Sequence, residues 1–339
     1  MKVVTFGEIM LRLNPSGFFQ LFQRGELEAS FAGSEANVAV SIANYGADAT
    51  FVTKVPDNAL GDAVIRELRG YGVDTSQVAK GGKRLGIYFV ERGYSHRPSK
   101  VIYDRENSAI AESSLDDYNW DQVFSDADWF HFSGITPALS KNLAEICEFA
   151  CRAAKSKGLI VSCDLNYRAK LWSRSEAAKT MSKLMEYVDY LIGNEADASD
   201  VFGVSLRDSD VTSGELSKEG YKIMAKELTD RFGFVGVAFS LRGSISATIN
   251  DWSGMLYVDE QAHFAPKYRI HIVDRIGAGD SFAGALIYAL ASSYAPQRAV
   301  CFAVAASCLK HSIEHDFNRV GLLDIERLME GDKSGRVQR

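Results

Sequence analysis

The sequence predicts an α/β fold in which a central, mostly parallel sheet is covered by helices on both faces. From residue 129 onward, short apolar runs alternate with segments that carry apolar residues at helical spacing. This alternation is typical of βαβ units, whose parallel strands are buried on both faces. The composition agrees, because 46% hydrophobic and 24% charged residues in a chain of 339 allow a large buried core.

In the first third of the chain, apolar residues at helical spacing before Gly46 and Gly72 predict two helices. Two regions depart from the α/β pattern: an excursion that contains Pro15 and Gly17, and two β-like runs around a turn-rich segment. In order, we expect a strand over 3–6, the excursion over 11–31, a helix over 35–45, a strand over 50–55, a helix over 60–71 and a hairpin from 86–90 and 99–103.

The rest of the chain is expected to form alternating elements, followed by a meander and two helices. We expect strands over 129–132, 159–163, 190–192 and 235–239, and helices over 142–157, 176–187 and 218–232. The meander is expected over 245–249, 255–258 and 271–273, and the last helices over 279–291 and 297–311.

Charge and composition argue against several classes of protein. The net charge is −6, whereas a nucleic-acid surface needs a clustered excess of Lys and Arg. No stretch is apolar enough to span a bilayer, and the amino terminus lacks the apolar segment of a signal peptide. The five cysteines form no CxxC pair, so buried thiols are expected rather than a metal site or disulfides. We therefore expect a cytoplasmic protein with no nucleic-acid or membrane partner.

Polar residues follow three successive strands of the predicted parallel sheet, at 164–168, 194–197 and 240–243. An open α/β sheet binds its ligands outside the carboxyl ends of its strands. Asn, Asp and Gly are also common in ordinary turns, which is the alternative explanation for each loop. Three such loops at neighbouring strand ends favour a ligand site.

The segment 273–282 carries the strongest chemical signal, because a strand runs through glycines directly into a helix. Gly277 and Gly279 let backbone N–H groups approach an anion, and the new helix directs its free donors to the same point. Asp280 in the first turn could be a simple partner of the helix dipole. A carboxylate beside a phosphate site is also what phosphoryl transfer needs as a general base.

Two other glycine motifs can be excluded from the letters. The only Gly-Lys pair, Gly82–Lys83, lacks the hydroxyl residue that follows in a Walker A loop. Gly277 and Gly279 reach their next glycine only at Gly284, which does not match the Rossmann spacing.

The segment 274–280, DRIGAGD, resembles the carboxy-terminal signature D-T-x-G-A-G-D of the PfkB, or ribokinase-like, sugar kinases, with Arg275 in place of threonine. The amino-terminal counterpart, a glycine pair leading to N-x-A, is matched by 32–39, with Ala32 in place of one glycine. The resemblance extends from Val3 to about Leu328. It implies a ribokinase-like α/β fold with a small β lid, and an ATP- and Mg²⁺-dependent sugar kinase. Some relatives also use a monovalent cation.

The resemblance also assigns roles at the catalytic centre. Asp280 is implied as the base, with an anion hole formed by Gly277, Ala278 and Gly279. The family motif N-x-x-E, tied to magnesium, is matched by Asn194 and Asp197, and Glu195 could share the metal.

Within the family, the chain is most similar to 2-keto-3-deoxygluconate kinases, on the residues of 86–88, 101–105, 133–139 and 164–168. Arginines suit the carboxylate of a sugar acid or the phosphates of a nucleotide. The implied substrate residues are Gly33, Asn37, Tyr88, Tyr103, Arg105, Arg168, Asp280 and Asp316, with Glu314 as a competitor of Asp316. The implied nucleotide residues are Asn166, Arg168, Asn194, Ser240, Arg242, Gly243, Ser246, Gly277, Gly279 and Phe302.

Without the resemblance, Tyr88 and Tyr103 would read as ordinary strand aromatics, and Arg105 beside Asp104 as a surface ion pair. The resemblance further implies one domain over 1–330, a lid from 11–31 and 86–105, a polar tail over 331–339, and a homodimer or larger homo-oligomer formed through the lid. The expected reaction is phosphorylation of the sugar acid. Alternatives are another sugar kinase, such as a fructokinase, or a non-catalytic sugar or nucleotide sensor on the same fold.

Overall fold

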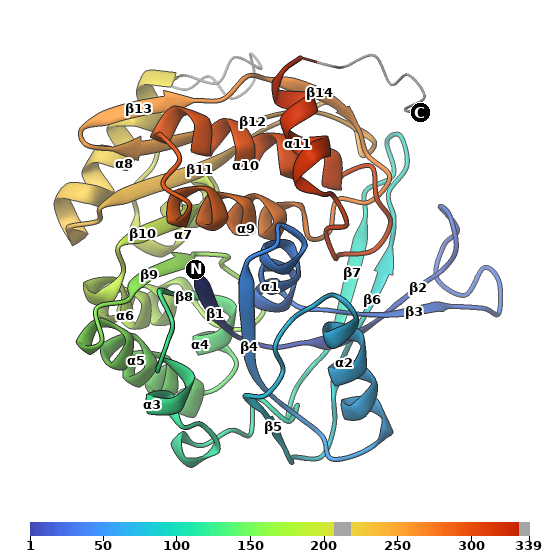
Figure 1. Cartoon of the computed structure of the whole chain (residues 1–339). Helices are drawn as coiled ribbons and strands as arrows, with labels where there is room; N and C mark the ends of the chain where they lie inside the picture. The colour runs from blue at the N-terminus through green and yellow to red at the C-terminus, as the bar shows by residue number, and fades with distance from the viewer. Residues whose placement is uncertain (207–217, 332–339) are drawn as a thin grey trace.

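The structure is a computed structural model that describes residues 1–206 and 218–331, and these form a large sheet, a small sheet and helices around them (Figure 1). The large sheet has the order β13-β12-β11-β10-β9-β8-β1-β4-β5, with β14 paired to β12. Its strands are β1 (Lys2–Phe6), β4 (Asp48–Val55), β5 (Val78–Lys80), β8 (Trp129–Ser133), β9 (Ile160–Asp164), β10 (Tyr190–Gly193), β11 (Gly236–Ser244), β12 (Ile249–Val258), β13 (Gln261–Phe264) and β14 (Tyr268–His271).

In the spatial order of this sheet, each strand from β5 across to β11 pairs in parallel with the next. At the other edge, β12 pairs in antiparallel fashion with β11, β13 and β14. The predicted mostly parallel sheet is therefore confirmed. Parallel strands point their carboxyl ends to one edge of the sheet, where the polar residues that follow β9 and β10 lie. The polar segment 240–243, expected as a loop, is instead part of β11 and pairs with β12.

Helices cover both faces of this sheet, and each face has its own hydrophobic core. One core contains side chains of α1 (Ser34–Asn44), α2 (Ala59–Gly70), α9 (Ala278–Ala291), α10 (Pro296–Lys310) and α11 (Leu322–Met329). The other contains side chains of α3 (Trp120–Val123), α5 (Lys141–Ser156), α6 (Arg174–Leu184), α7 (Glu195–Phe202) and α8 (Lys218–Phe232). A short helix α4 (Ile135–Ala138) follows β8, and 3₁₀ turns lie at Leu115–Asp117 and Met185–Tyr187.

Side-chain caps begin several of these helices, as their sequences allow. Asn58 accepts hydrogen bonds from the first turn of α2, Ser140 caps α5, and Ser173 forms a capping box with Glu176 at α6. Asn194 caps α7 through the backbone N–H of Asp197. This last cap fixes a predicted site residue at the end of β10.

The small sheet has the order β3-β2-β6-β7 and projects from one side of the molecule (Figure 1). Its strands are β2 (Met10–Asn14), β3 (Glu28–Ala32), β6 (Gly86–Glu91) and β7 (Lys100–Asp104). The second sheet expected from the resemblance is thus present, built from the two regions that depart from the α/β pattern. Its role as a lid and the extent of a single domain stay predictions.

Some expected elements were wrong in detail. Residues 245–248 form the turn between β11 and β12 rather than a strand, and β14 (Tyr268–His271) shares only His271 with the strand expected over 271–273. The strands β5 and β13 and the helices α3, α4, α7 and α11 were not predicted from the sequence. The predicted polar tail lies outside the described residues from 332 onward.

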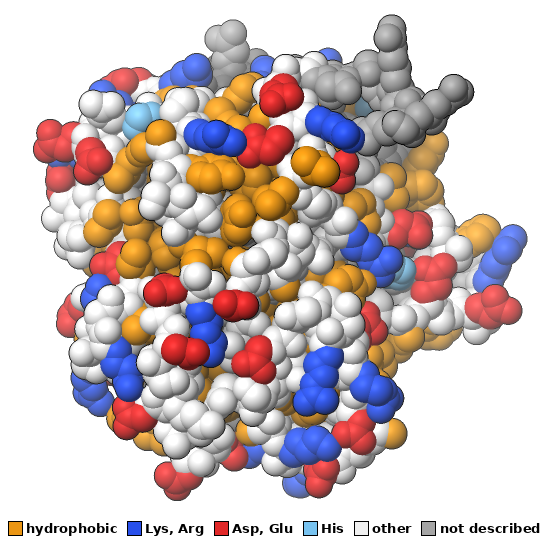
Figure 2. Space-filling view, viewed as in Figure 1, with side chains coloured by type: hydrophobic (Ala, Val, Ile, Leu, Met, Phe, Trp, Pro, Cys, Tyr) orange, Lys and Arg blue, Asp and Glu red, His pale blue; other side chains and the backbone are white. Residues whose placement is uncertain are grey.

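The surface mixes both signs of charge. On the face shown in Figure 2, Lys and Arg side chains lie among Asp and Glu side chains without a continuous basic field. Within residues 1–206 and 218–331, no helix is long and apolar enough to cross a membrane. The five cysteines are free, and the cytoplasmic location stays a prediction.

Candidate active site

A cavity of about 480 Å³ lies where the carboxyl edge of the large sheet meets the small sheet. Its wall contains residues from the first turns of α1, α7 and α9, so three helix N-termini face one space. Helix N-termini present free N–H donors and a partial positive charge, which favours anionic ligands. All three predicted polar segments reach this cavity, through Asp164 at the end of β9, Asn194 directly after β10 and Ser240 within β11.

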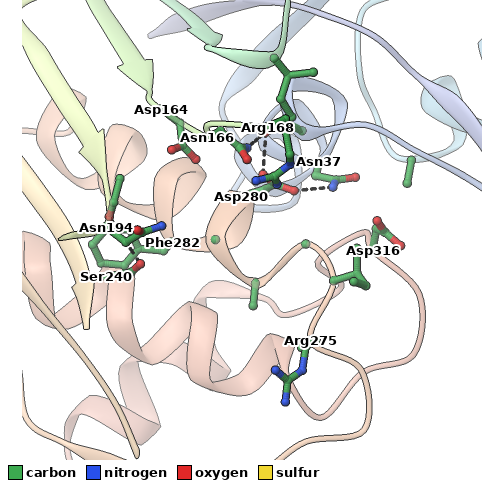
Figure 3. Close-up of a pocket in the computed structure, with 18 of the residues that line it drawn as sticks. Asn37, Asp164, Asn166, Arg168, Asn194, Ser240, Arg275, Asp280, Phe282 and Asp316 are labelled. Carbon is green, nitrogen blue, oxygen red and sulfur yellow. Dashed lines mark hydrogen bonds between the residues drawn. The ribbon is translucent and has the colours of Figure 1, made fainter. Parts of the chain in front are cut away.

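Asp280 lies in the first turn of α9 and is 9% exposed. Ser34 Oγ donates to its Oδ1 at 2.7 Å, and Asn37 Nδ2 donates to its Oδ2 at 2.6 Å. Asn166 Nδ2 donates in turn to Ser34 Oγ at 3.2 Å. The two signatures, 243 residues apart at Asn37 and Asp280, thus meet at one carboxylate (Figure 3).

The glycines of both signatures are explained by close backbone approach. Gly277 has φ +80, and a Cβ there would lie 2.2 Å from the carbonyl oxygen of Asp316. A Cβ on Gly33 would lie 1.8 Å from the carbonyl oxygen of Glu8. A side chain at either position would push the adjoining segments apart and open the wall of the cavity.

Carboxylates at the strand ends share a poorly solvated space. Burial raises the pKa of Asp164 well above its usual value, and the nearby charges of Asp197 and Asp280 raise it further. Burial also raises the pKa of Asp197 to about 6, against the opposing charge of Arg168. The pKa of Asp280 is raised by burial, which the hydrogen bonds from Asn37 and Ser34 oppose. This concentration of negative charge beside Arg168 suits a cation between carboxylates.

The opposite end of the cavity is built from the small sheet. Tyr88 and Tyr103 stack with ring centroids 5.9 Å apart, and the Arg105 guanidinium lies 5.1 Å from the Tyr103 ring. Arg105 is buried and donates from Nε to Glu8 Oε2 at 2.8 Å, and Ser108 Oγ donates to Glu8 Oε1 at 2.7 Å. Arg105 Nη1 has no hydrogen-bond partner in the described part of the chain. The surface ion pair with Asp104 is not formed, because Asp104 pairs with Arg84.

Arg12 joins the small sheet to the loops around α9 and α10. Its guanidinium is fully buried, forms an ion pair with Asp274 at 2.5 Å and donates to Asp316. Tyr88 Oη donates to the other oxygen of Asp316 at 2.8 Å. Burial alone would lower the pKa of Arg12, but the charges of Asp316 and Asp274 outweigh it and raise this pKa.

Most of the predicted site residues line the cavity. These are Gly33, Asn37, Tyr88, Tyr103, Arg105, Asn166, Arg168, Asn194, Asp197, Ser240, Arg242, Gly277, Ala278, Gly279, Asp280 and Asp316. Asp316 lies at the cavity, whereas its competitor Glu314 pairs with Arg92 at 2.6 Å and is not part of the wall.

Three predicted nucleotide residues are not brought to the cavity. Phe302 is fully buried on α10, where its ring packs against Tyr45, Tyr288 and Tyr294. The cavity wall holds Phe282 instead. Gly243 and Ser246 lie near the β11–β12 turn outside the wall, and Ser246 Oγ accepts from the backbone of that turn.

The sequence analysis assigned no role to Glu8, Arg12, Ser34, Glu35 or Asp274. Glu35 is buried and accepts hydrogen bonds from Ser133 and Thr136, which pins the start of α1 to β8 and α4. A signal for Arg12 was present, since it lies between the leucines of the short strand β2 at a buried position.

Comparison with known proteins agrees with this architecture. A profile of the pfkB family carbohydrate kinases matches residues 1–312. A solved structure of 2-dehydro-3-deoxygluconokinase from Thermotoga maritima is 52% identical, superposes with a TM-score of 0.94 and covers 98% of either chain. The 2-dehydro-3-deoxygalactonokinase of Haloferax volcanii is 34% identical over 98% of both chains, and the 2-dehydro-3-deoxygluconokinase of Thermoproteus tenax is 30% identical over 93% of this chain and 90% of its own. From the paired signatures, the fold and these matches, the chain belongs to the pfkB family of carbohydrate kinases.

Proposed function

We propose that this protein is a 2-dehydro-3-deoxygluconokinase, which transfers the γ-phosphoryl group of ATP to 2-keto-3-deoxygluconate and forms the 6-phosphate. The observation that carries the proposal is the buried Asp280 carboxylate, held by both signatures at the start of α9. The relatives named for keto-deoxy sugar acids support the substrate class.

Asp280 is the proposed general base. Its carboxylate takes the proton of the attacking hydroxyl as the new O–P bond forms, and the leaving group is ADP. The backbone N–H groups of 277–279 lie at the N-terminus of α9, where they can stabilise the negative charge that grows on the transferred phosphoryl oxygens. The hydrogen bonds from Ser34 and Asn37 orient the carboxylate before the substrate arrives.

Arg105 is the proposed ligand of the substrate carboxylate. Both Nε and Nη2 of its guanidinium donate to Glu8, and Arg105 lines the cavity together with Tyr88 and Tyr103. A planar guanidinium suits a carboxylate, because two parallel N–H groups can be offered to two oxygens.

Replacing Arg105 with lysine is expected to raise the KM for the sugar acid about tenfold, since lysine keeps a charge for Glu8 but loses the planar fork. The KM for ATP is expected to stay unchanged, as measured by steady-state kinetics with each substrate varied. Arg84→Lys is the matched control, because Arg84 lies on the same hairpin and pairs at the surface with Asp104. An unchanged sugar-acid KM in Arg105→Lys would remove this residue from the substrate site.

Asn194, Asp197 and Asp164 are the proposed residues for Mg²⁺, with Glu195 beside them in the cavity wall. The donor set fits, because Mg²⁺ prefers oxygen ligands, keeps several waters and needs only one or two carboxylates. The raised pKa values of Asp164 and Asp197 also fit, since buried carboxylates without a cation resist ionisation. A bound Mg²⁺ would neutralise charge on the ATP phosphates.

The pKa of Asp197 predicts a pH dependence of Mg²⁺ binding and of stability. The Mg²⁺ concentration for half-maximal activity is expected to fall as the pH rises through about 6, because the ligand must lose its proton. Without Mg²⁺, the folded state holds this proton more tightly than the unfolded chain, whose pKa is near 3.8. This contribution to stability is therefore complete below that value and is lost as the pH rises through about 6.

Asp197→Asn removes this ionisable group, so the variant should lose the step near pH 6 in the Mg²⁺ titration. In thermal scans without Mg²⁺, it should gain stability relative to the unaltered protein between pH 5 and pH 7.5. Asp230→Asn is the control, because Asp230 lies on α8 outside the cavity wall and pairs with Lys226 at the surface. Identical pH profiles for Asp197→Asn and the unaltered protein would contradict the assignment.

The proposal is tested by a substrate panel in an assay coupled to ADP release. The panel contains 2-keto-3-deoxygluconate, its C4 epimer 2-keto-3-deoxygalactonate, fructose and ribose. The expected result is the highest kcat/KM with 2-keto-3-deoxygluconate. A preference for the epimer would reassign the substrate toward that of the Haloferax relative, and a preference for fructose would make the protein a fructokinase. Binding without turnover would support a sensor.

The small sheet is the proposed lid and homo-oligomer contact. Its loops expose Phe22 at 71% and its strand β7 exposes Ile102 at 53%, and such apolar side chains are commonly covered by a partner. Light scattering of the purified protein, which measures the mass of the assembly, tests the expected dimer.

A further inference from the structure

Two arginines of the cavity wall have no role in the proposed function so far. Arg275 stands where the family signature has threonine, and Arg242 stands near the end of β11. Both belong to the cavity that also holds Asp280. Asp280 works at the acceptor end of the reaction, whereas the Arg275 guanidinium points away from it (Figure 3).

The protein provides hydrogen-bond acceptors for only part of the Arg275 guanidinium. Its Nη2 donates to the carbonyl oxygen of Ala247 in the β11–β12 turn at 2.6 Å. Its Nε is shielded from solvent and has no hydrogen-bond partner within residues 1–206 and 218–331. A buried N–H without a partner is costly, so a ligand that accepts from this edge would be favoured.

Neither of the two arginines is paired with a carboxylate of the described residues. Asp274 is the acidic neighbour of Arg275, but its Oδ2 is held by Arg12 and its Oδ1 accepts from the backbone N–H of Ile276 at 3.1 Å. Among the described residues, neither Arg275 nor Arg242 forms an ion pair. Burial lowers the pKa of Arg275, and the charge of Arg242 lowers it further. Two like charges thus lie near one another in the cavity wall, where Arg242 is exposed and Arg275 is partly buried, and an anion between them would relieve their repulsion.

We propose that Arg275 and Arg242 form a subsite for the phosphate groups of ATP that are not transferred. Guanidinium groups bind phosphate oxygens through paired charge-assisted hydrogen bonds. Binding at these phosphates would fix the nucleotide so that its γ-phosphoryl group meets the N-terminus of α9. This inference rests on the proposed kinase function but concerns nucleotide binding alone.

The test is calorimetric binding of ATP, ADP and adenosine to the full-length protein. Arg275→Thr introduces the residue of the family signature at this position and removes the charge. The variant is expected to raise the Kd of ATP and ADP about 10–100-fold, which is the loss typical of one charge-assisted contact. Arg242→Ala is expected to act in the same direction. The Kd of adenosine, which carries no phosphate, should stay within about twofold, because this subsite would not touch it.

The control is Arg298→Thr, since Arg298 pairs with Glu326 at the surface and lies outside the cavity wall. An ATP Kd in Arg275→Thr that matches this control would overturn the subsite. So would an equal loss of ATP and adenosine binding, because that would indicate a general disturbance of the nucleotide site. The readout does not depend on phosphoryl transfer. A protein that binds ATP through these arginines but phosphorylates no sugar acid would contradict the proposed function and leave the subsite standing.

Discussion

Replacing Asp280 with asparagine is expected to lower kcat about 10²–10⁴-fold, the range that a positioned general base contributes. Asparagine has nearly the same shape but cannot take the proton of the sugar hydroxyl. Ser34 and Asn37 now donate to the carboxylate, and they hold it at the N-terminus of α9. The assay measures ADP release at saturating sugar acid and ATP, and the Kd of ATP is measured separately to show that the nucleotide still binds.

The loss of activity should not come from unfolding. Burial raises the pKa of Asp280 above its usual 3.8, so ionising this group costs stability as the pH rises through its folded-state pKa. The uncharged asparagine avoids that cost, and the variant is expected to melt no lower than the unaltered protein at pH 7.5. A large drop in melting temperature would mean that the carboxylate serves the structure.

Asp324→Asn is the matched control for a helix-dipole role. Asp324 lies in the first turn of α11, is exposed and stands outside the cavity wall. A dipole partner contributes about 0.3–1 kcal/mol to stability and nothing to the chemical step. If Asp280→Asn behaved like Asp324→Asn, with a small change in stability and normal turnover, Asp280 would not be the base.

The sequence could predict which residues gather at the Asp280 end of the cavity, because its signals there are local. Gly277 and Asp280 lie three positions apart where the chain enters α9, so their proximity follows from that turn. The polar residues after β9 and β10 were also predictable, because parallel strands bring their carboxyl ends to one edge, whereas the segment 240–243 continues the strand β11. Phe302, which only the resemblance assigned to the nucleotide, is buried against the rings of Tyr45, Tyr288 and Tyr294, and no local pattern predicts such packing.

The rest of the site depends on contacts between distant segments. Arg12 and Asp316 are 304 positions apart, and Glu8 and Arg105 are 97 apart. No local sequence pattern predicts which buried arginine pairs with which carboxylate. An inward arginine in the strand β2 indicates only that a carboxylate partner must exist, since a buried charge without one is strongly disfavoured.

Replacing Arg12 with methionine is expected to destabilise the protein by about 3–5 kcal/mol, as is typical when one partner of a buried ion pair is removed. Asp274 and Asp316 are 2% and 3% exposed and would keep their charges without a counterion. Lys310 cannot replace the guanidinium, because its Nζ donates to backbone carbonyl groups, including that of His315 at 2.6 Å. The sugar-acid KM should also rise, since Arg12 and Tyr88 fix the Asp316 carboxylate at the cavity.

Thermal scans of Arg12→Met and of the unaltered protein test this prediction. In Arg12→Met, the buried carboxylates of Asp274 and Asp316 lose the guanidinium that pairs with both, so the melting temperature should fall by several degrees. Arg269→Met is the control, because Arg269 pairs with Asp251 at the surface and should change stability by less than about 1 kcal/mol.

A triple variant separates structure from binding. Adding Asp274→Asn and Asp316→Asn to Arg12→Met removes the unpaired charges and should recover much of the melting temperature. The sugar-acid KM should stay high, because the Asp316 carboxylate is then absent from the cavity. Recovery of both stability and KM would show that this network only holds the small sheet in place. A melting temperature for Arg12→Met equal to that of Arg269→Met would mean that the buried pairs contribute little to the fold.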